Sequence, residues 1–247
     1  RHGGDIQGII NHLDYIKELG ATAVWPTPLC EDNDERGSYH TYGQSDVYKI
    51  DSRFGTNEDY VRLSSELHKR GMKNIMDYVT NHWGWQHWMY KDLPTKDWVH
   101  QFPEFTQSNY RMTSQFDINA SKIDAKNCMD GWFVPSMPDL NQSNPLVLNY
   151  LTQNAIWWIE YADLDGFRVD TYSYNDKVGI AGVSEGIDGI HRFVAMGKAD
   201  AQAVLLKLAI ADKLCGRIDN ALFDGHGQNQ RFNDGARKEV GTQGAIV

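Results

Sequence analysis

Apolar residues near the start of the chain recur with the period of a helix and then with that of a strand. Isoleucine and leucine recur at helical spacing between Ile6 and Ile16, with Asp5 as the expected N-cap and Gly20 as the end of the helix. Residues 21–26 then form a short apolar run that is typical of a buried strand. The chain therefore opens with a predicted helix followed by a predicted strand.

The same alternation continues with two more helices and two more strands. A second helix is expected after Thr56, because its hydroxyl and Asp59 match a capping box, and a strand follows over residues 73–78. Pro145 occupies the favoured first position of a third helix, which is followed by a strand over residues 164–170. Alternating strands and helices predict a parallel sheet of the α/β class.

The chain divides into four regions by pattern and composition. Residues 1–82 and 143–177 carry the alternating elements, whereas residues 83–142 are irregular, aromatic and too long for a simple connection. All eight tryptophans and all twelve tyrosines lie in these three regions. Residues 178–247 are rich in glycine, and their one amphipathic pattern predicts a packing helix over residues 204–211.

The charge balance narrows the class of partner. The formal net charge is −9 and the sequence pI is about 5.4, whereas nucleic acids and anionic membranes attract basic surfaces. No segment approaches the run of about 20 apolar residues that spans a membrane. The three cysteines are too widely spaced for a zinc site or a disulfide framework. We therefore expect a neutral polar substrate, and neither nucleic acid nor a membrane as a partner.

Candidate chemistry is concentrated at the end of the strand over residues 164–170, in the run Gly-Phe-Arg-Val-Asp-Thr. Side chains alternate between the two faces of a strand, so Arg168 and Asp170 are expected on the same face. A guanidinium beside a carboxylate favours the ionised form of the carboxylate, which is the nucleophilic form. Taken alone, an Arg-x-Asp pair on a strand is more often a structural ion pair.

Three further segments precede this run in a fixed order. They are Ser-Tyr-His-Thr-Tyr-Gly at 38–43, Asp-Tyr-Val-Thr-Asn-His at 77–82 and Met-Pro-Asp-Leu-Asn at 137–141. Together with residues 166–171, they resemble the signature segments of the α-amylase superfamily, glycoside hydrolase family 13. The Met-Pro-Asp-Leu-Asn form leans toward the neopullulanase and cyclomaltodextrinase branch. The resemblance covers residues 1–177.

This resemblance implies a fold, a reaction and a partner. The implied fold is a partial (β/α)₈ TIM-type barrel, incomplete at both ends, with a small irregular domain inserted after the third strand. The implied reaction is retaining hydrolysis of α-glucosidic bonds in starch-derived glucans, maltooligosaccharides or pullulan. The implied partner is therefore an α-glucan or maltooligosaccharide. A periplasmic or secreted location is favoured, and an oligomer that completes or covers the half barrel is left open.

The resemblance also implies roles for individual side chains. Asp170 is expected to be the nucleophile, and Arg168 to orient it and keep it ionised. His40 and His82 are expected to hydrogen-bond hydroxyls of the glucosyl ring beside the scissile bond. Tyr42 is expected to stack on that ring, because an aromatic face suits the apolar face of a pyranose.

The same resemblance allows a bound calcium ion as a possibility, and no cofactor is expected to be required. Many members of the superfamily hold calcium between the barrel and the inserted domain with oxygen ligands. Asn81 and Asp139 match positions that supply such oxygens, which are the ligands that calcium prefers. At one further position the superfamily has a histidine, whereas this chain has Tyr174. Asp77 is expected to be a structural carboxylate rather than a proton carrier.

The general acid cannot be identified from the sequence. The superfamily places a glutamate about one βα unit after the nucleophile, but Glu185 comes too early and its neighbours do not match. The third carboxylate follows an Asn-His pair in the superfamily, and neither Asp224 nor Asp234 does so here. Two readings are therefore kept: an α-glucan hydrolase, and a non-catalytic glucan-binding or vestigial fragment.

Overall fold

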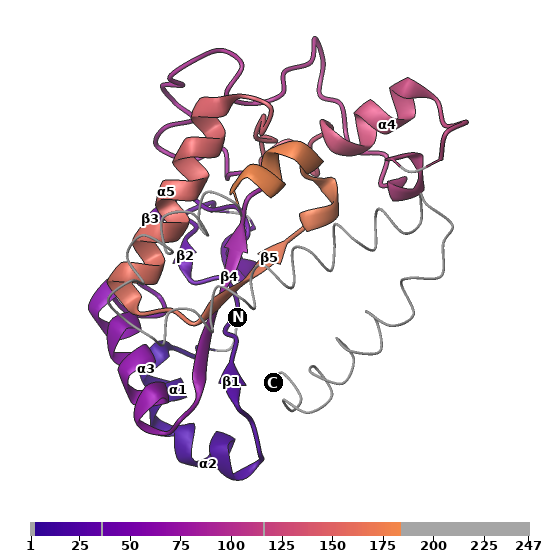
Figure 1. Ribbon diagram of the computed structural model, residues 1–247. Helices are drawn as coiled ribbons and strands as arrows, with labels where there is room; N and C mark the ends of the chain where they lie inside the picture. The colour runs from indigo at the N-terminus through magenta and orange to yellow at the C-terminus, as the bar shows by residue number, and fades with distance from the viewer. Residues whose placement is uncertain (1–2, 36, 116, 184–247) are drawn as a thin grey trace, which may run out of the picture.

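Figure 1 shows the computed structural model, which describes residues 3–35, 37–115 and 117–183 of the 247-residue chain. The α-helices of this part are α1 (Ile6–Asn11), α2 (Leu13–Glu18), α3 (Asn57–Lys69), α4 (Lys122–Met129) and α5 (Pro145–Ala162). The strands are β1 (Ala23–Val24), β2 (Cys30–Glu31), β3 (Asp46–Ile50), β4 (Lys73–Val79) and β5 (Gly166–Asp170). Three short 3₁₀ helices, η1 (Ser38–His40), η2 (Met112–Gln115) and η3 (Tyr172–Tyr174), lie between them.

The centre of the described structure is a three-stranded parallel sheet in the order β1-β4-β5. The pairing of β4 with β5 places Asp77 opposite Arg168 and Val79 opposite Asp170. In Figure 1, α3 and α5 lie together on one side of β4 and β5. The predicted α/β class and its parallel sheet are therefore confirmed.

Several helix boundaries follow directly from their capping residues. The predicted capping box of α3 is present, with Thr56 accepting from the backbone of Asp59 and Asp59 accepting from the backbone of Thr56. Asn144 caps α5, and Pro145 takes the first position of this helix as predicted. The predicted N-cap at Asp5 is also present, since its side chain accepts from the backbone of Gly8.

The first predicted helix is wrong in one respect, because it is two short helices. The chain leaves helical geometry at His12, where φ is −112° and ψ is 8°. The His12 ring nitrogen Nδ1 lies 2.7 Å from the carbonyl oxygen of Gly8. The backbone N–H of His12 donates to the carbonyls of Ile9 and Ile10. The isoleucine and leucine spacing continues across this break because both helices face the same core, which includes Ile6 and Leu13.

An antiparallel pair of short strands, β2 and β3, was not predicted. These strands lie between β1 and α3 and pair Cys30 with Ile50. They are joined to α5 by two side chains, because Asn154 and Trp158 both donate to the carbonyl of Val47, at 3.1 and 2.8 Å. The two strands therefore form a second layer next to α5. The segment that contains η1 connects β2 to β3.

The irregular stretch over residues 83–142 leaves the end of β4 and returns to it. Its return is fixed by Leu140, whose backbone donates to the carbonyl of Asn81, and by Trp83, whose backbone donates to Pro138. Trp83 and Trp98 are buried inside it, as expected for a small core. Helix α4 lies at the far end of this stretch from the sheet (Figure 1). This arrangement gives the insertion its own packing while anchoring it at the β4 end.

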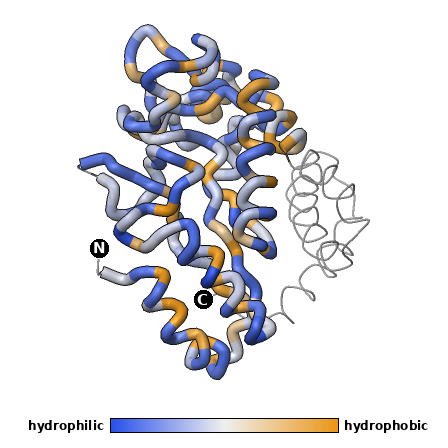
Figure 2. The backbone as a smooth tube through the Cα atoms, turned by 90° about the vertical axis from the view of Figure 1, so that its left-hand side faces the viewer, coloured by the Kyte–Doolittle hydropathy of each residue, from blue (hydrophilic) through white to orange (hydrophobic). Residues whose placement is uncertain are grey.

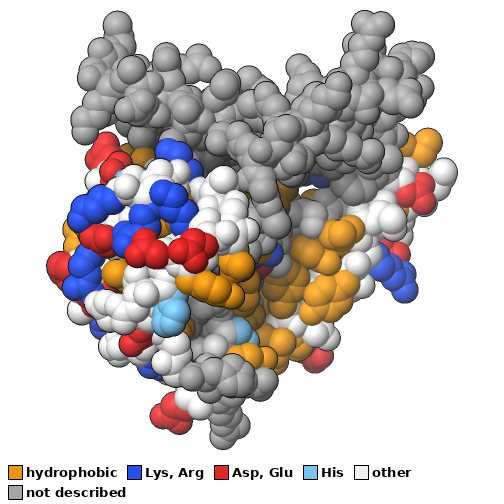
Figure 3. All heavy atoms as spheres, turned by 90° about the horizontal axis from the view of Figure 1, so that it is seen from below, with side chains coloured by type: hydrophobic (Ala, Val, Ile, Leu, Met, Phe, Trp, Pro, Cys, Tyr) orange, Lys and Arg blue, Asp and Glu red, His pale blue; other side chains and the backbone are white. Residues whose placement is uncertain are grey.

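The surface of the described part mixes charged, polar and apolar side chains. Along the backbone tube, hydrophobic and hydrophilic residues alternate, as expected of elements with one buried face (Figure 2). Seen from below, acidic and basic side chains lie side by side (Figure 3). Ion pairs of this kind include Arg70 with Asp14 and with Glu66. Within the described residues, no helix is both long enough and apolar enough to span a membrane.

Gly84 marks the closest approach between the insertion and the segment that contains η1. A methyl group at Gly84 would lie 2.2 Å from the carbonyl oxygen of Gly43, which is backbone and cannot swing away.

Gly84→Ala is therefore expected to lower the free energy of unfolding by about 1–3 kcal/mol. Urea unfolding followed by tryptophan fluorescence measures this change. Gly37→Ala is the matched control, because a methyl group there meets nothing within 4 Å. Equal stability of the two variants would contradict the close approach.

Candidate active site

The carboxyl ends of β4 and β5 bring one guanidinium between two carboxylates. Arg168 Nη1 lies 3.1 Å from both carboxylate oxygens of Asp77 and 2.5 Å from Oδ1 of Asp170. The spacing of two residues in β5 and the parallel register with β4 together produce this geometry. The structure therefore places Arg168 and Asp170 in contact, and it adds Asp77 to the pair.

Asp77 is a buried carboxylate whose oxygens are both engaged. Oδ2 accepts from the indole of Trp25 at 2.9 Å, and both oxygens accept from Arg168. Burial raises the pKa of Asp77, and the charge of Arg168 opposes that rise. Arg168 also lies over the Trp25 ring, 5.0 Å from its centroid. Asp77 therefore anchors the arginine, and each of its oxygens accepts at least one hydrogen bond.

Tyr42 and His40 reach this cluster from the segment after β2. The Tyr42 hydroxyl lies 3.4 Å from Asp77 Oδ2 and from Arg168 Nη1. Burial raises the pKa of Tyr42, as does the nearby charge of Asp77, so the phenol stays protonated. The ring nitrogen Nδ1 of His40 accepts from the Tyr42 backbone at 3.0 Å, and the two rings are 5.7 Å apart. The His40 ring is therefore fixed relative to the backbone of Tyr42.

His82 lies just beyond β4 and is almost fully buried, at 2 % exposure. Burial lowers the pKa of His82 to about 4, so its imidazole is neutral at pH 7. Its Nε2 has no hydrogen-bond partner among the described residues, and its ring packs edge-on against Phe133. A neutral imidazole of this kind can hydrogen-bond a hydroxyl, but it cannot supply a positive charge.

Asn81 and Asp139 meet where the insertion returns to β4. Asn81 Nδ2 donates to Asp139 Oδ1 at 2.8 Å, and His100 Nδ1 lies 2.7 Å from Asp139 Oδ2. Burial raises the pKa of Asp139 to about 7, against the opposing effect of His100. No local pattern in the sequence indicates a role for His100, which lies 39 positions from Asp139.

One oxygen at this junction, on Asn81, suits a hard cation, whereas both oxygens of Asp139 already have partners. Asn81 Oδ1 is buried without a hydrogen-bond partner, and it belongs to the same amide that touches Asp139. An oxygen in this state is suited to ligate calcium. Among the described residues, no group of three or more His, Cys, Asp or Glu side chains is arranged to hold a metal. The other ligands of an ion here would therefore be backbone carbonyls and water.

A polar cavity of about 310 Å³ lies beside this junction rather than at the arginine cluster. It is lined by His100, Lys126, Met129, Asp130, Asn141, Ser143 and Asp176. Its charged side chains already pair with one another, since Lys126 contacts Asp130 and His100 lies 3.8 Å from the same carboxylate. The cavity separates part of the insertion from the segment after β5.

The positions compared above with the general acid and with the third carboxylate, none of which matches the superfamily pattern, lie outside the described residues. Glu185, Asp224 and Asp234, and the helix predicted over 204–211, all fall after residue 183. Within the described part, residues 177–183 are helical and follow η3. Trp25, which the sequence did not single out, is an additional side chain in contact with the strand-end cluster.

Comparison with known proteins identifies the family. The model of the α-amylase catalytic domain matches residues 1–202, which extends past the last signature segment. Cyclomaltodextrinase from Geobacillus thermopakistaniensis is 35% identical over 177 residues, 68% of this chain and 27% of that protein. The intracellular maltogenic amylase of Bacillus subtilis is 35% identical over 185 residues, 71% of this chain and 28% of that protein. The chain thus spans just over a quarter of the length of these relatives.

Solved structures give the same result for the fold. An α-amylase from Anoxybacillus superposes with a TM-score of 0.65 at 40% identity, covering 77% of this chain and 38% of that one. The α-amylase from Geobacillus thermoleovorans, solved with acarbose, superposes with a TM-score of 0.63 at 39% identity, covering 76% and 38%. The fold and the strand-end cluster define part of a glycoside hydrolase barrel. The chain belongs to the α-amylase family, glycoside hydrolase family 13, which confirms the resemblance and the partial barrel.

The engagement of Asp77 leads to a prediction about stability. Asp77→Asn removes the charge that faces Arg168 while keeping the shape of the side chain, and it is expected to lower the free energy of unfolding by about 1–3 kcal/mol. Urea unfolding measures the change. Asp92→Asn, an exposed aspartate without an ion pair among the described residues, is the matched control. A stability of Asp77→Asn equal to that of the control would show that the buried contact contributes nothing.

Proposed function

We propose that this chain binds α-glucans and carries the nucleophile side of a retaining α-glucosidic hydrolase. The observation that carries the proposal is the bridge of Arg168 between Asp77 and Asp170 at the ends of two parallel strands. In barrels of this type, catalytic groups lie at the carboxyl ends of the strands. The relatives named as amylases and as a cyclomaltodextrinase support a starch-derived glucan or maltooligosaccharide as the substrate.

In the proposed reaction, Asp170 attacks the anomeric carbon of the glucosyl unit. The bond to the leaving oxygen breaks with its electron pair, a general acid protonates that oxygen, and a covalent glycosyl ester forms on Asp170. Water then attacks the same carbon, the conjugate base of the general acid takes a proton from that water, and Asp170 leaves as a carboxylate. Arg168 fixes the direction of the Asp170 carboxylate through its contact with Oδ1.

The proposed sugar contacts come from three side chains around this cluster. Tyr42 offers a partly buried ring with its hydroxyl turned to Arg168, and a pyranose ring prefers such an apolar face. His82 is neutral, and its Nε2 has no hydrogen-bond partner among the described residues. His40 is tied to Tyr42 and completes the group. Together they would hold a glucosyl unit over Asp170.

Non-catalytic glucan binding is the second candidate function, and the state of Asp77 favours it. Double displacement needs a carboxylic acid near the nucleophile. The other carboxylate at the described site is Asp77, and its oxygens accept from Trp25 and Arg168. Unless an acid comes from outside the described residues, the chain would bind the glucan without cleaving it.

The first experiment separates these two functions. Release of reducing sugar from maltoheptaose and from pullulan is measured for the unmodified chain, Asp170→Asn and Asp163→Asn. For an active enzyme, Asp170→Asn is expected to lose activity by about 10⁴-fold or more. Asp163→Asn is the matched control and is expected to keep it, because Asp163 is exposed and lies before β5.

Calorimetric titration with acarbose and with maltoheptaose completes this test. Binding without turnover by the unmodified chain would select the non-catalytic function. Turnover that survives in Asp170→Asn would remove Asp170 as the nucleophile. Neither binding nor turnover in a chain with a cooperative unfolding transition would overturn both candidate functions.

We also propose that calcium binds at Asn81 and Asp139, in a structural role. The oxygen of Asn81 without a partner and the buried Asp139 carboxylate support this proposal. An ion there would hold the insertion on β4, because Asn81 follows that strand and Asp139 belongs to the returning segment. In this family no cofactor is required for the hydrolytic reaction itself.

Calcium is expected to raise the free energy of unfolding of the chelated chain by about 2.7 kcal/mol at a hundred times its Kd. Unfolding with and without calcium, and calorimetric titration of the ion, measure this effect. Asp139→Asn is expected to abolish it, whereas Asp92→Asn is expected to retain it. No heat and no shift on adding calcium to the unmodified chain would refute the site.

A further inference from the structure

The segment over residues 32–43 carries His40 and Tyr42 but has little regular structure of its own. Among its described residues, which leave out residue 36, the one element is the three-residue helix η1, which ends at Thr41 in a left-handed conformation with φ of 60°. A threonine rarely adopts this conformation, so the surrounding structure must hold it there. The position of the two proposed sugar-binding rings therefore depends on contacts that the segment makes with its neighbours.

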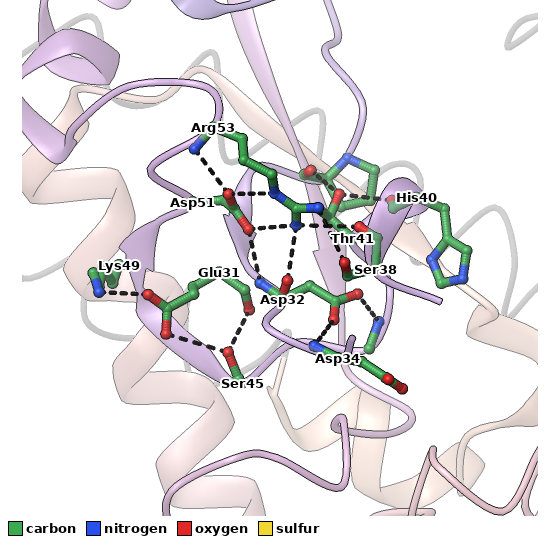
Figure 4. A network of polar contacts seen from close by, with 12 residues as sticks. Glu31, Asp32, Asp34, Ser38, His40, Thr41, Ser45, Lys49, Asp51 and Arg53 are labelled. Atoms are coloured by element: carbon green, nitrogen blue, oxygen red, sulfur yellow. Dashed lines mark hydrogen bonds and ion pairs between the residues drawn. The ribbon is translucent and has the colours of Figure 1, made fainter. Parts of the chain in front are cut away.

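Arg53, which follows β3, makes the largest set of these contacts (Figure 4). Its Nη1 donates to Ser38 Oγ at 3.0 Å, and its Nη2 donates to the carbonyl of Ser38 at 3.2 Å. Nη2 also donates to the carbonyl of Asp32 at 2.8 Å. One guanidinium thus binds the segment both at its beginning and at the start of η1.

Asp51 fixes the direction of this guanidinium. It accepts from Arg53 Nε at 2.8 Å and from Nη2 at 2.6 Å, which is a bidentate pair. Asp51 Oδ2 also accepts from the backbone N–H of Asp32 at 3.1 Å. Asp51 is buried at 3 % exposure, so the pair is held in one orientation. The guanidinium cannot rotate away from Ser38 without breaking this pair.

Asp32 closes the segment on itself. Its Oδ2 accepts from the backbone of Gly43 at 3.1 Å, and its Oδ1 accepts from the backbone of Asp34 at 3.2 Å. The side chain is 2 % exposed. Figure 4 shows Asp32 between Arg53 and the part of the segment that leads back toward β3. The two ends of the segment are therefore joined through one carboxylate, and Arg53 holds the start of η1 between them.

We propose that Arg53 is a positioning residue for glucan binding, which acts by holding η1 so that Tyr42 reaches Arg168 and His40 stays bonded to the Tyr42 backbone. This inference rests on the proposed glucan-binding function and adds a residue to it. Arg53 has no contact with Asp77, Arg168 or Asp170 among the hydrogen bonds of the described part, so its effect passes through Ser38 and the turn at Thr41.

Affinity for acarbose and maltoheptaose, measured by calorimetric titration of the full chain, is the first test. Arg53→Met is expected to raise the Kd by about tenfold, because it removes the charged donors that hold Ser38 and Asp32. Arg53→Lys is also expected to weaken binding, since an ammonium cannot form the bidentate pair with Asp51. Arg62→Met is the matched control, because Arg62 pairs with Asp59 on the surface of α3.

Hydrogen exchange gives a readout that does not depend on sugar. The backbone N–H groups of Tyr42 and Gly43 are bonded to His40 Nδ1 and Asp32 Oδ2, so they are expected to exchange slowly. In Arg53→Met, exchange in residues 38–43 is expected to accelerate, while exchange in α5 stays unchanged. Unchanged exchange in residues 38–43 would overturn the role of Arg53, whatever the chain binds.

A double-mutant cycle separates positioning from a general loss of stability. In a chain that already carries His40→Ala and Tyr42→Ala, Arg53→Met is expected to cause less than about a twofold further loss of affinity, because the rings it positions are gone. An equal loss in both backgrounds would overturn the inference. If Arg53→Met does not fold, Ser38→Ala removes the contact with Nη1 alone and is expected to raise the Kd by about two- to threefold.

The outcomes distinguish this inference from the function on which it rests. Failure of the unmodified chain to bind either sugar would overturn the proposed function, and the positioning role with it. Binding by the unmodified chain with the same Kd in Arg53→Met would overturn the positioning role alone. A tenfold weaker Kd together with faster exchange in residues 38–43 would support both.

Discussion

The bridge made by Arg168 between Asp77 and Asp170 is the interaction on which the arrangement of the site depends. A buried carboxylate such as Asp77 is stable only with a charged or hydrogen-bonding partner, and Arg168 and Trp25 supply both. Because β4 and β5 are parallel and in register, the arginine that neutralises Asp77 also reaches Asp170 two residues further along its own strand. One guanidinium thus satisfies a buried charge and sets the direction of the proposed nucleophile.

Side chains at this site are positioned in two different ways. Arg168, Asp170 and Asp77 belong to strands, so the sheet itself fixes where they point. His40 and Tyr42 belong to an irregular segment, and a second network of charges around Arg53 has to supply the order that a strand would provide. Both networks have the same chemistry, in which an arginine is held by a buried aspartate. The first lies beneath the proposed substrate, and the second lies behind the segment that would cover it.

The sequence predicted those parts of the structure whose cause is local. The period of two in β5 placed Arg168 beside Asp170, and the capping box at Thr56 and Asp59 placed the start of α3. The break at His12, the pairing of β2 with β3 and the contact of His100 with Asp139 were missed, because each depends on residues that meet only after folding. Asp51 did carry a local signal, since an aspartate that accepts from the backbone two residues later marks a turn.

In the proposed function, sugar binding and turnover depend on different groups. The proposed binding involves Tyr42, His40 and His82, which lie among the described residues around the arginine bridge or next to it. Turnover would need in addition an acid that can protonate the leaving oxygen. We expect Asp77 to act as the anchor of Arg168, with which both of its oxygens are bonded, rather than as that acid. A change that freed Asp77 to carry a proton would release Arg168, and with it the orientation of Asp170. On this proposal, the described half of the site would hold the glucan, and cleavage would depend on a carboxyl group that this half does not contain.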